Sequence, residues 1–197
     1  MSDEQHKKLI AAAEFFNESA RKLLATERGL HAETLISSVA RMAGSLMYRS
    51  FGFDEKIAPG TSVLSDQANT HGPKLMNLMF VTLQQLGQQV GEGNINRDYY
   101  SRKFSQLTFQ QAHEQLAAFF LQYCKAAQIS FHDAALGAAI ATGILINDCR
   151  EVLDVEKGAA IAIYGFIEGT KTAPYPIGQT ASQSPSTRAK KPWYKLW

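Results

Sequence analysis

The segment 65–74 contains the most varied group of ligand-type side chains in the chain. Asp66, Asn69 and His71 offer oxygen and nitrogen atoms that bind a metal ion or position a substrate, and Lys74 adds a positive charge. Asp, Asn and Thr also dominate ordinary turns, because their side chains hydrogen-bond to the nearby backbone. We therefore favour turn formation and helix capping in this segment. A ligand or metal site at these four residues is the alternative.

Known catalytic patterns fail at one required residue or are missing. His113 and Glu114 begin like the zinc-protease pattern His-Glu-x-x-His, but Ala117 stands where the second histidine is required. A single ligand cannot complete a three-ligand zinc site, so we interpret His113 as a solvated helix histidine. The sequence contains neither the Glu-x-x-His pairs of di-iron bundles nor a glycine-rich phosphate loop. One histidine can ligate haem, but no Cys-x-x-Cys-His attachment site is present.

The two cysteines indicate a reducing compartment, because one pair does not make a disulfide scaffold. Cys149 lies between Asp148 and Arg150, and a neighbouring cation can lower the pKa of a thiol. We favour the simpler interpretation of Cys149 as a small residue at the end of a buried helix. The longest apolar stretch, 134–146, is shorter than the roughly 20 residues of a membrane span. The first thirty residues lack the apolar core of a signal peptide, so we predict a soluble, cytoplasmic protein.

The last ten residues combine cations with aromatic rings. The members of this group that we expect to dock on another surface are Arg188, Lys190, Lys191, Trp193, Tyr194 and Trp197. Tryptophans are typical anchors of protein interfaces. We expect docking on the same chain or on a sister subunit, with a different protein as the next alternative. An anionic membrane surface and single-stranded nucleic acid are weaker candidates.

Charge divides the chain near Thr170. Residues 171–197 hold five basic and no acidic residues, whereas the first 170 hold 15 basic and 18 acidic residues. The body is therefore mildly acidic, which disfavours a nucleic-acid-binding surface. Four of the six prolines also lie after residue 170. We predict a helical domain over 1–170 and a Pro/Ser-rich basic-aromatic tail over 171–197.

The body has the hydrophobic periodicity of helices joined by short loops. Helices are predicted over about 3–26, from beyond Gly29 to about 50, 73–90, 109–128, 132–150 and 155–168, with a short helix around 62–68 and one irregular turn within 98–106. Thr108 with Gln111 predicts a capping box, and Ser130 with Asp133 repeats the spacing. No convincing alternating strand pattern occurs. The prediction is an all-α fold, a single globular bundle of six or seven helices over 3–170 with the apolar helix after His132 at its centre.

Small residues line one face of the last predicted helix. Gly158, Ala162, Gly165 and Gly169 recur at helical spacing. Each mid-helix glycine costs about 1 kcal/mol relative to alanine, so something must approach this helix closely. We favour a tight pair with the preceding helix. The alternative is a face that receives another subunit's helix or a ligand.

The functional prediction is a non-enzymatic interaction or scaffold protein. It would form a homo-oligomer or hold a partner protein through its helical faces and its tail. The alternative is a small-molecule or metal-binding helical protein with its site at 65–74. A hydrolytic enzyme is one version of this alternative. We expect no cofactor and no bound metal, and the failure of each catalytic template favours a protein without enzymatic activity.

Overall fold

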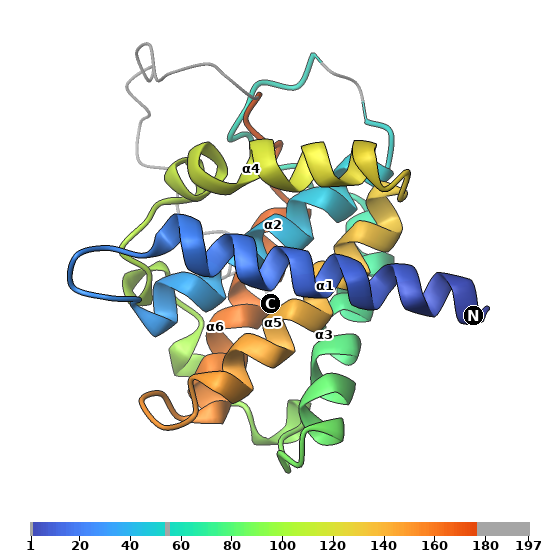
Figure 1. Ribbon diagram of the computed structural model, residues 1–197. Helices are drawn as coiled ribbons and strands as arrows, with labels where there is room; N and C mark the ends of the chain where they lie inside the picture. The colour runs from blue at the N-terminus through green and yellow to red at the C-terminus, as the bar shows by residue number, and fades with distance from the viewer. Residues whose placement is uncertain (1, 54–55, 177–197) are drawn as a thin grey trace.

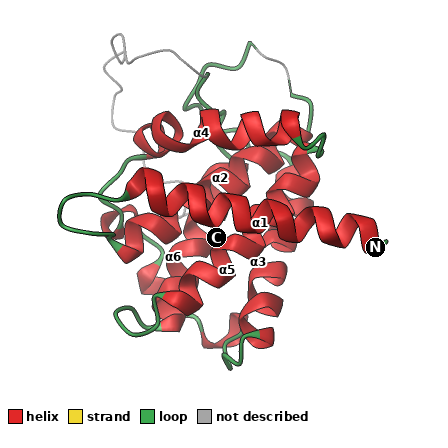
Figure 2. Cartoon of the chain, in the orientation of Figure 1, coloured by secondary structure: helices red, strands yellow, loops and turns green. Residues whose placement is uncertain are grey.

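The computed structural model describes residues 2–53 and 56–176. These residues form six α-helices and three short 3₁₀-helices, and this part of the chain contains no β-strand (Figures 1 and 2). The α-helices are α1 (Asp3–Leu24), α2 (Ala32–Ser50), α3 (Asp66–Gln85), α4 (Phe109–Ala126), α5 (Phe131–Asp148) and α6 (Val155–Thr170). The predicted all-α bundle is confirmed. No helix of the described residues is both long and apolar enough to cross a bilayer.

The helix starts follow from local side-chain chemistry. Thr108 Oγ1 accepts from the backbone N–H of Gln111, and Gln111 Oε1 accepts from the N–H of Thr108, so the predicted capping box is present. Ser130 likewise accepts from the N–H of Asp133 at the start of α5. Asp154 caps α6 through the N–H of Lys157. These bonds satisfy donors that the first helical turn leaves without intrahelical partners.

Two helices form the centre of the bundle. The apolar helix α5 packs against α1, α2 and α3, as its sequence predicts. Helix α2 shares that position, because every residue from Thr34 to Tyr48 is buried. The sequence predicts only a buried stripe on α2. In the structure α5, α6 and α4 all contact it, so its polar residues are buried as well.

The small-residue face of α6 packs mainly on α2. A Cβ atom placed on Gly165 would lie 2.8 Å from the Cβ of Ala40, and one placed on Gly44 would lie 2.6 Å from the carbonyl oxygen of Phe166. Of the three glycines on this face, only Gly158 would place a Cβ nearest to α5, at Ile146. The predicted tight helix pair exists, but its main partner is α2 instead of the preceding helix.

Helix α3 differs from its prediction at both ends. It begins at Asp66 and continues through Gly72 and Pro73, where the sequence predicts a break and a fresh start. Ser65 Oγ accepts from the N–H of Ala68, so the helix is already capped eight residues before Pro73. The helix ends at Gln85, because Gly87 has a φ of +85° and its N–H bonds to the carbonyl of Gln84.

Residues 91–106 contain 3₁₀-helices at Glu92–Asn94, Arg97–Tyr99 and Arg102–Phe104, where the sequence predicts a polar loop and one irregular turn. They lead the chain to the start of α4. On α4, Leu116 and Phe120 face the core, whereas Phe119 is an exposed aromatic. Phe119 precedes Phe120 by about 100° around the helix, which places it outside the face that α1 and α2 cover.

Candidate functional site

A cavity of about 410 Å³ lies where α2, α6 and the start of α4 meet two extended segments. We call it the Arg41 cavity. The residues of its lining that matter below are Arg41, Ser62, Arg102, Phe109, Glu168, Lys171 and Tyr175. In Figure 1, α4 lies along one end of the bundle, and the cavity is at the start of that helix. Pockets of this size commonly hold small molecules.

The extended segments pair with each other and form one wall of the cavity. The N–H of Gly60 donates to Ala173 O, that of Val63 to Lys171 O, and that of Ala173 to Thr61 O, each at 2.8–2.9 Å. Side chains of extended backbone alternate between two faces, and here residues 60, 62 and 64 line the cavity while 61 and 63 do not. Gly60 has a φ of +77°, and a Cβ there would meet the hydroxyl of Tyr175. Glycine therefore allows both the turn and the position of the tyrosine.

Arg41 supplies a buried positive charge to this cavity. Its side chain is only 1% exposed, and its Nε donates to Glu168 Oε2 at 2.7 Å. Its Nη1 donates to the carbonyl oxygen of Leu107 at 2.7 Å and to Ser105 Oγ at 3.2 Å. Within the described residues, Nη2 has no hydrogen-bond partner. Arg41 therefore retains donor capacity next to the cavity that it lines.

Glu168 is shared between two arginines. Its side chain is 10% exposed, and its second oxygen lies 3.6 Å from Nε of Arg102. The same Nε donates to the hydroxyl of Tyr164 at 3.1 Å. Burial and the negative charge of Glu168 raise the pKa of Tyr164, so its hydroxyl stays protonated near neutral pH. The site therefore contains two arginines around one carboxylate, and Lys171 adds a third cation to the lining.

The start of α4 forms another part of the lining. Thr108, Phe109 and Gln110 all border the cavity. The capping box uses the N–H groups of Thr108 and Gln111, and the structure gives those of Phe109 and Gln110 no acceptor among the described residues. Free N–H groups at a helix start carry partial positive charge and favour anions. The electrostatic character of this end of α4 matches that of the arginines.

The four site residues predicted at 65–74 lie on the first turns of α3. Helical geometry places Asp66 and Asn69 on one side and His71 and Lys74 on another. His71 Nδ1 lies 3.2 Å from Lys74 Nζ, so this pair is brought together. Partial burial, then Lys74 and His132, lowers the pKa of His71. Asp66 and Asn69 are exposed. A ligand site at these residues stays a prediction.

His113 corrects the interpretation of a solvated histidine. The residue is 2% exposed, and its ring lies beside those of Phe109 and Tyr175, with centroids 4.5 Å and 6.3 Å away. Its Nδ1 lies 3.3 Å from the carbonyl oxygen of Phe109, and since a carbonyl only accepts, Nδ1 carries the proton. Nε2 is buried with no partner in the described structure. Burial lowers the pKa of His113 to about 4, so the ring is neutral at pH 7.

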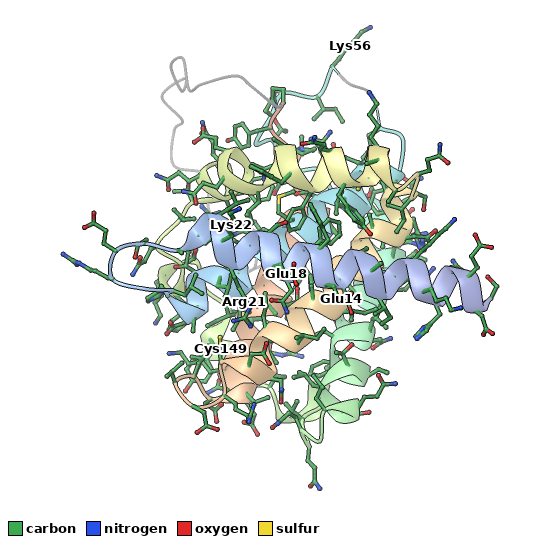
Figure 3. All side chains as sticks on the ribbon, viewed as in Figure 1. Glu14, Glu18, Arg21, Lys22, Lys56 and Cys149 are labelled. Atoms are coloured by element: carbon green, nitrogen blue, oxygen red, sulfur yellow. The ribbon has the colours of Figure 1, made fainter. Side chains whose placement is uncertain are left out.

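The remaining chemical candidates gain no support. Burial raises the pKa of the Cys149 thiol, although Arg21 acts in the opposite direction, so a lowered pKa there is wrong. Figure 3 shows Arg21 and Cys149 on the same side of the molecule, and Arg21 Nη2 bonds to Asp148 Oδ2 at 2.6 Å. Across residues 2–53 and 56–176, no three His, Cys, Asp or Glu side chains are grouped closely enough to hold a metal ion. The tail residues 188–197 lie outside the described residues.

Comparisons with known protein families, with curated proteins and with solved structures find no match for this chain. The Arg41 cavity is therefore assessed on its own geometry. It combines a buried guanidinium with a free Nη2, a cationic lining and the amino end of a helix. Such an arrangement can bind and orient a small molecule.

Proposed function

We propose that this protein is a non-enzymatic binding protein for a small molecule, which it holds in the Arg41 cavity. One observation carries the proposal: Arg41, whose side chain is only 1% exposed, borders a cavity of about 410 Å³, and its Nη2 has no partner among the described residues. Nη2 has no acceptor among the described residues, and a bound ligand would supply one.

The groups at the buried end of the cavity favour binding over catalysis. Glu168 accepts from Arg41, and Ser105 Oγ donates to the carbonyl oxygen of Leu107 at 2.9 Å. The serine proton is thus held by a carbonyl, which cannot act as a general base. These groups hold Arg41 in place.

Small-molecule binding is the function that the sequence offers as its alternative. The proposal retains that function but places the site in the Arg41 cavity and not at 65–74. The residues predicted for it lie on α3, and none of them lines the Arg41 cavity. The predicted interaction function stays a prediction, because the tail that would carry it lies outside the described residues.

The test is a thermal-shift screen with a library of metabolites of every charge type. A Ser62→Trp variant fills the cavity from its extended wall, where Ser62 is exposed. The matched control is Thr61→Trp, because Thr61 is equally exposed and its side chain faces away from the cavity. We expect at least one compound to stabilise the natural protein and Thr61→Trp, but not Ser62→Trp. Equal responses of both variants to every compound would refute the assignment of this cavity as the binding site.

A further inference from the structure

We propose that the ligand of the Arg41 cavity is a small anion, with a carboxylate or phosphate group bound to Arg41 and an apolar or aromatic body. This inference rests on the proposed function and specifies the chemistry of the ligand. Three features of the lining carry it: its charge balance, its donors without acceptors, and its aromatic residues.

The charged residues of the lining are three cations and one carboxylate. Arg41, Arg102 and Lys171 together with Glu168 give a formal charge of +2. Glu168 is already engaged by both arginines, at 2.7 Å from Arg41 and 3.6 Å from Arg102. A cationic ligand would meet net repulsion here, whereas the net positive charge of the lining attracts an anion.

The donors without acceptors determine what the ligand's polar group must offer. Arg41 Nη2 and the N–H groups of Phe109 and Gln110 have no acceptor among the described residues, and all three residues border the cavity. Carboxylates and phosphates present two or more acceptor oxygens, so one such group can serve several donors at once. The partial positive charge at the start of α4 favours the same anions.

Aromatic rings lie beside these donors. The rings of Phe109 and Tyr175 both line the cavity, with centroids 6.2 Å apart and planes inclined by 50°. Leu64 and Leu107 add aliphatic surface to the lining. An apolar body attached to the anion would contact these side chains, which inorganic phosphate cannot do. The volume of about 410 Å³ is at the small end of ligand pockets and matches a compact acid.

The chain's own tail does not meet these requirements. Residues 188–197 carry four basic side chains and no acidic one. A segment of that charge is repelled by a lining of charge +2. The occupant we infer is therefore a separate, negatively charged molecule.

The test compares four probes by isothermal titration calorimetry: phenyl phosphate, benzoate, benzyl alcohol and inorganic phosphate. We expect phenyl phosphate, benzoate or both to bind at least about ten-fold more tightly than benzyl alcohol, the difference that one charge-assisted hydrogen bond produces. Inorganic phosphate should bind more weakly than phenyl phosphate. Preference for one of the two anions identifies the ligand as a phosphate or a carboxylate.

The decisive variant is the double substitution Arg41→Met with Glu168→Met. It removes Nη2 but leaves the formal charge of the lining at +2, because one cation and one carboxylate are lost together. We expect the preference for the anions over benzyl alcohol to fall to less than about three-fold. Circular dichroism and a cooperative unfolding transition check that the variant folds. Should it not fold, Arg102→Gln with Lys171→Gln tests the same idea through the lining charge, and the anion preference should fall several-fold.

The inference is overturned if benzyl alcohol binds as tightly as both anions, if neither anion binds, or if the double variant keeps the full preference. The proposed function has a separate point of failure. It fails if no compound of any charge depends on the cavity in the Ser62→Trp comparison. If the cavity binds only a neutral compound, and Ser62→Trp abolishes that binding, the inference of an anionic ligand is wrong while the proposed binding function stands.

Discussion

Gly44 of α2 and Gly169 of α6 cross in direct backbone contact, so that a Cβ atom on Gly44 would lie 2.7 Å from the Cα of Gly169. This crossing is three residues from Arg41 on α2 and one residue from Glu168 on α6. The close approach of the two helices therefore brings the buried ion pair together. The glycine packing between α2 and α6 therefore also determines the positions of Arg41 and Glu168 at the cavity.

Alanine at either glycine of this crossing should destabilise the protein. The added methyl group has no space between two backbones, and overpacking of this kind costs about 1–3 kcal/mol or more. Urea unfolding of Gly44→Ala and Gly169→Ala measures the effect. The control is Gly93→Ala, because nothing lies within 4 Å of a Cβ at that position. Equal stability of all three variants would show that α2 and α6 are farther apart than described.

The Arg41–Glu168 pair should be strongly coupled. Arg41→Met leaves a carboxylate that is 10% exposed and keeps the longer ion pair with Arg102, at 3.6 Å, and losing one partner of a buried pair costs about 3–5 kcal/mol. The double variant with Glu168→Met removes both charges and should recover most of that loss. A double-mutant cycle in urea measures the coupling. Additive single effects would place the two side chains outside direct contact.

Stability should fall in mild acid because of His113. Its pKa is about 4 in the folded protein against 6.5 for a free histidine, so the unfolded chain binds the proton first. The contribution is complete above pH 6.5 and is lost as the pH falls through 4, by about 3 kcal/mol in total. His113→Leu should unfold with a flatter pH dependence between 6.5 and 4. Parallel profiles for the two proteins would mean that the ring is accessible to solvent.

Pro73→Ala should stabilise the protein. In the structure Pro73 is an interior residue of α3, where it cannot donate to the carbonyl of Asn69, and interior proline costs up to about 3 kcal/mol relative to alanine. A helix that started at Pro73 would give the opposite result, because proline is favourable in the first turn. A higher melting temperature for Pro73→Ala supports a helix that begins at Asp66, and a lower one supports a helix that begins at Pro73.

The tail prediction needs its own test. Truncation after Gln183 removes Trp193, Tyr194 and Trp197 together with the four basic residues of 188–197. If this segment docks on a sister subunit, the truncated protein should show a lower mass by light scattering. If it docks on its own chain, the truncated protein should bind a hydrophobic dye more strongly. An unchanged mass, stability and dye response would refute docking in either form.

Most of the helices could be predicted from the sequence, because caps and hydrophobic periodicity depend on residues that are close together in the chain. The capping box at Thr108 and the apolar run of α5 each specify an element within a few residues. The Arg41 cavity has no such signal, since Arg41 and Glu168 are 127 positions apart. What the sequence does show is a lone cation within the apolar part of α2 and a lone carboxylate within that of α6, and a buried charge of this kind requires a partner. At α3 two local signals conflict, and the cap at Ser65 prevails over the proline.

The pairing of residues 60–63 with 171–173 has a consequence for access to the cavity. Its three backbone hydrogen bonds join segments about 110 positions apart, and no helix contains them. They can therefore break together while the bundle stays folded, as local opening does in other proteins. The amide hydrogens of Gly60, Val63 and Ala173 should then share one protection factor against exchange with solvent, lower than the protection factors of α2. Since residues of both segments line the cavity, a bound molecule should slow all three, which makes their exchange a reporter of occupancy.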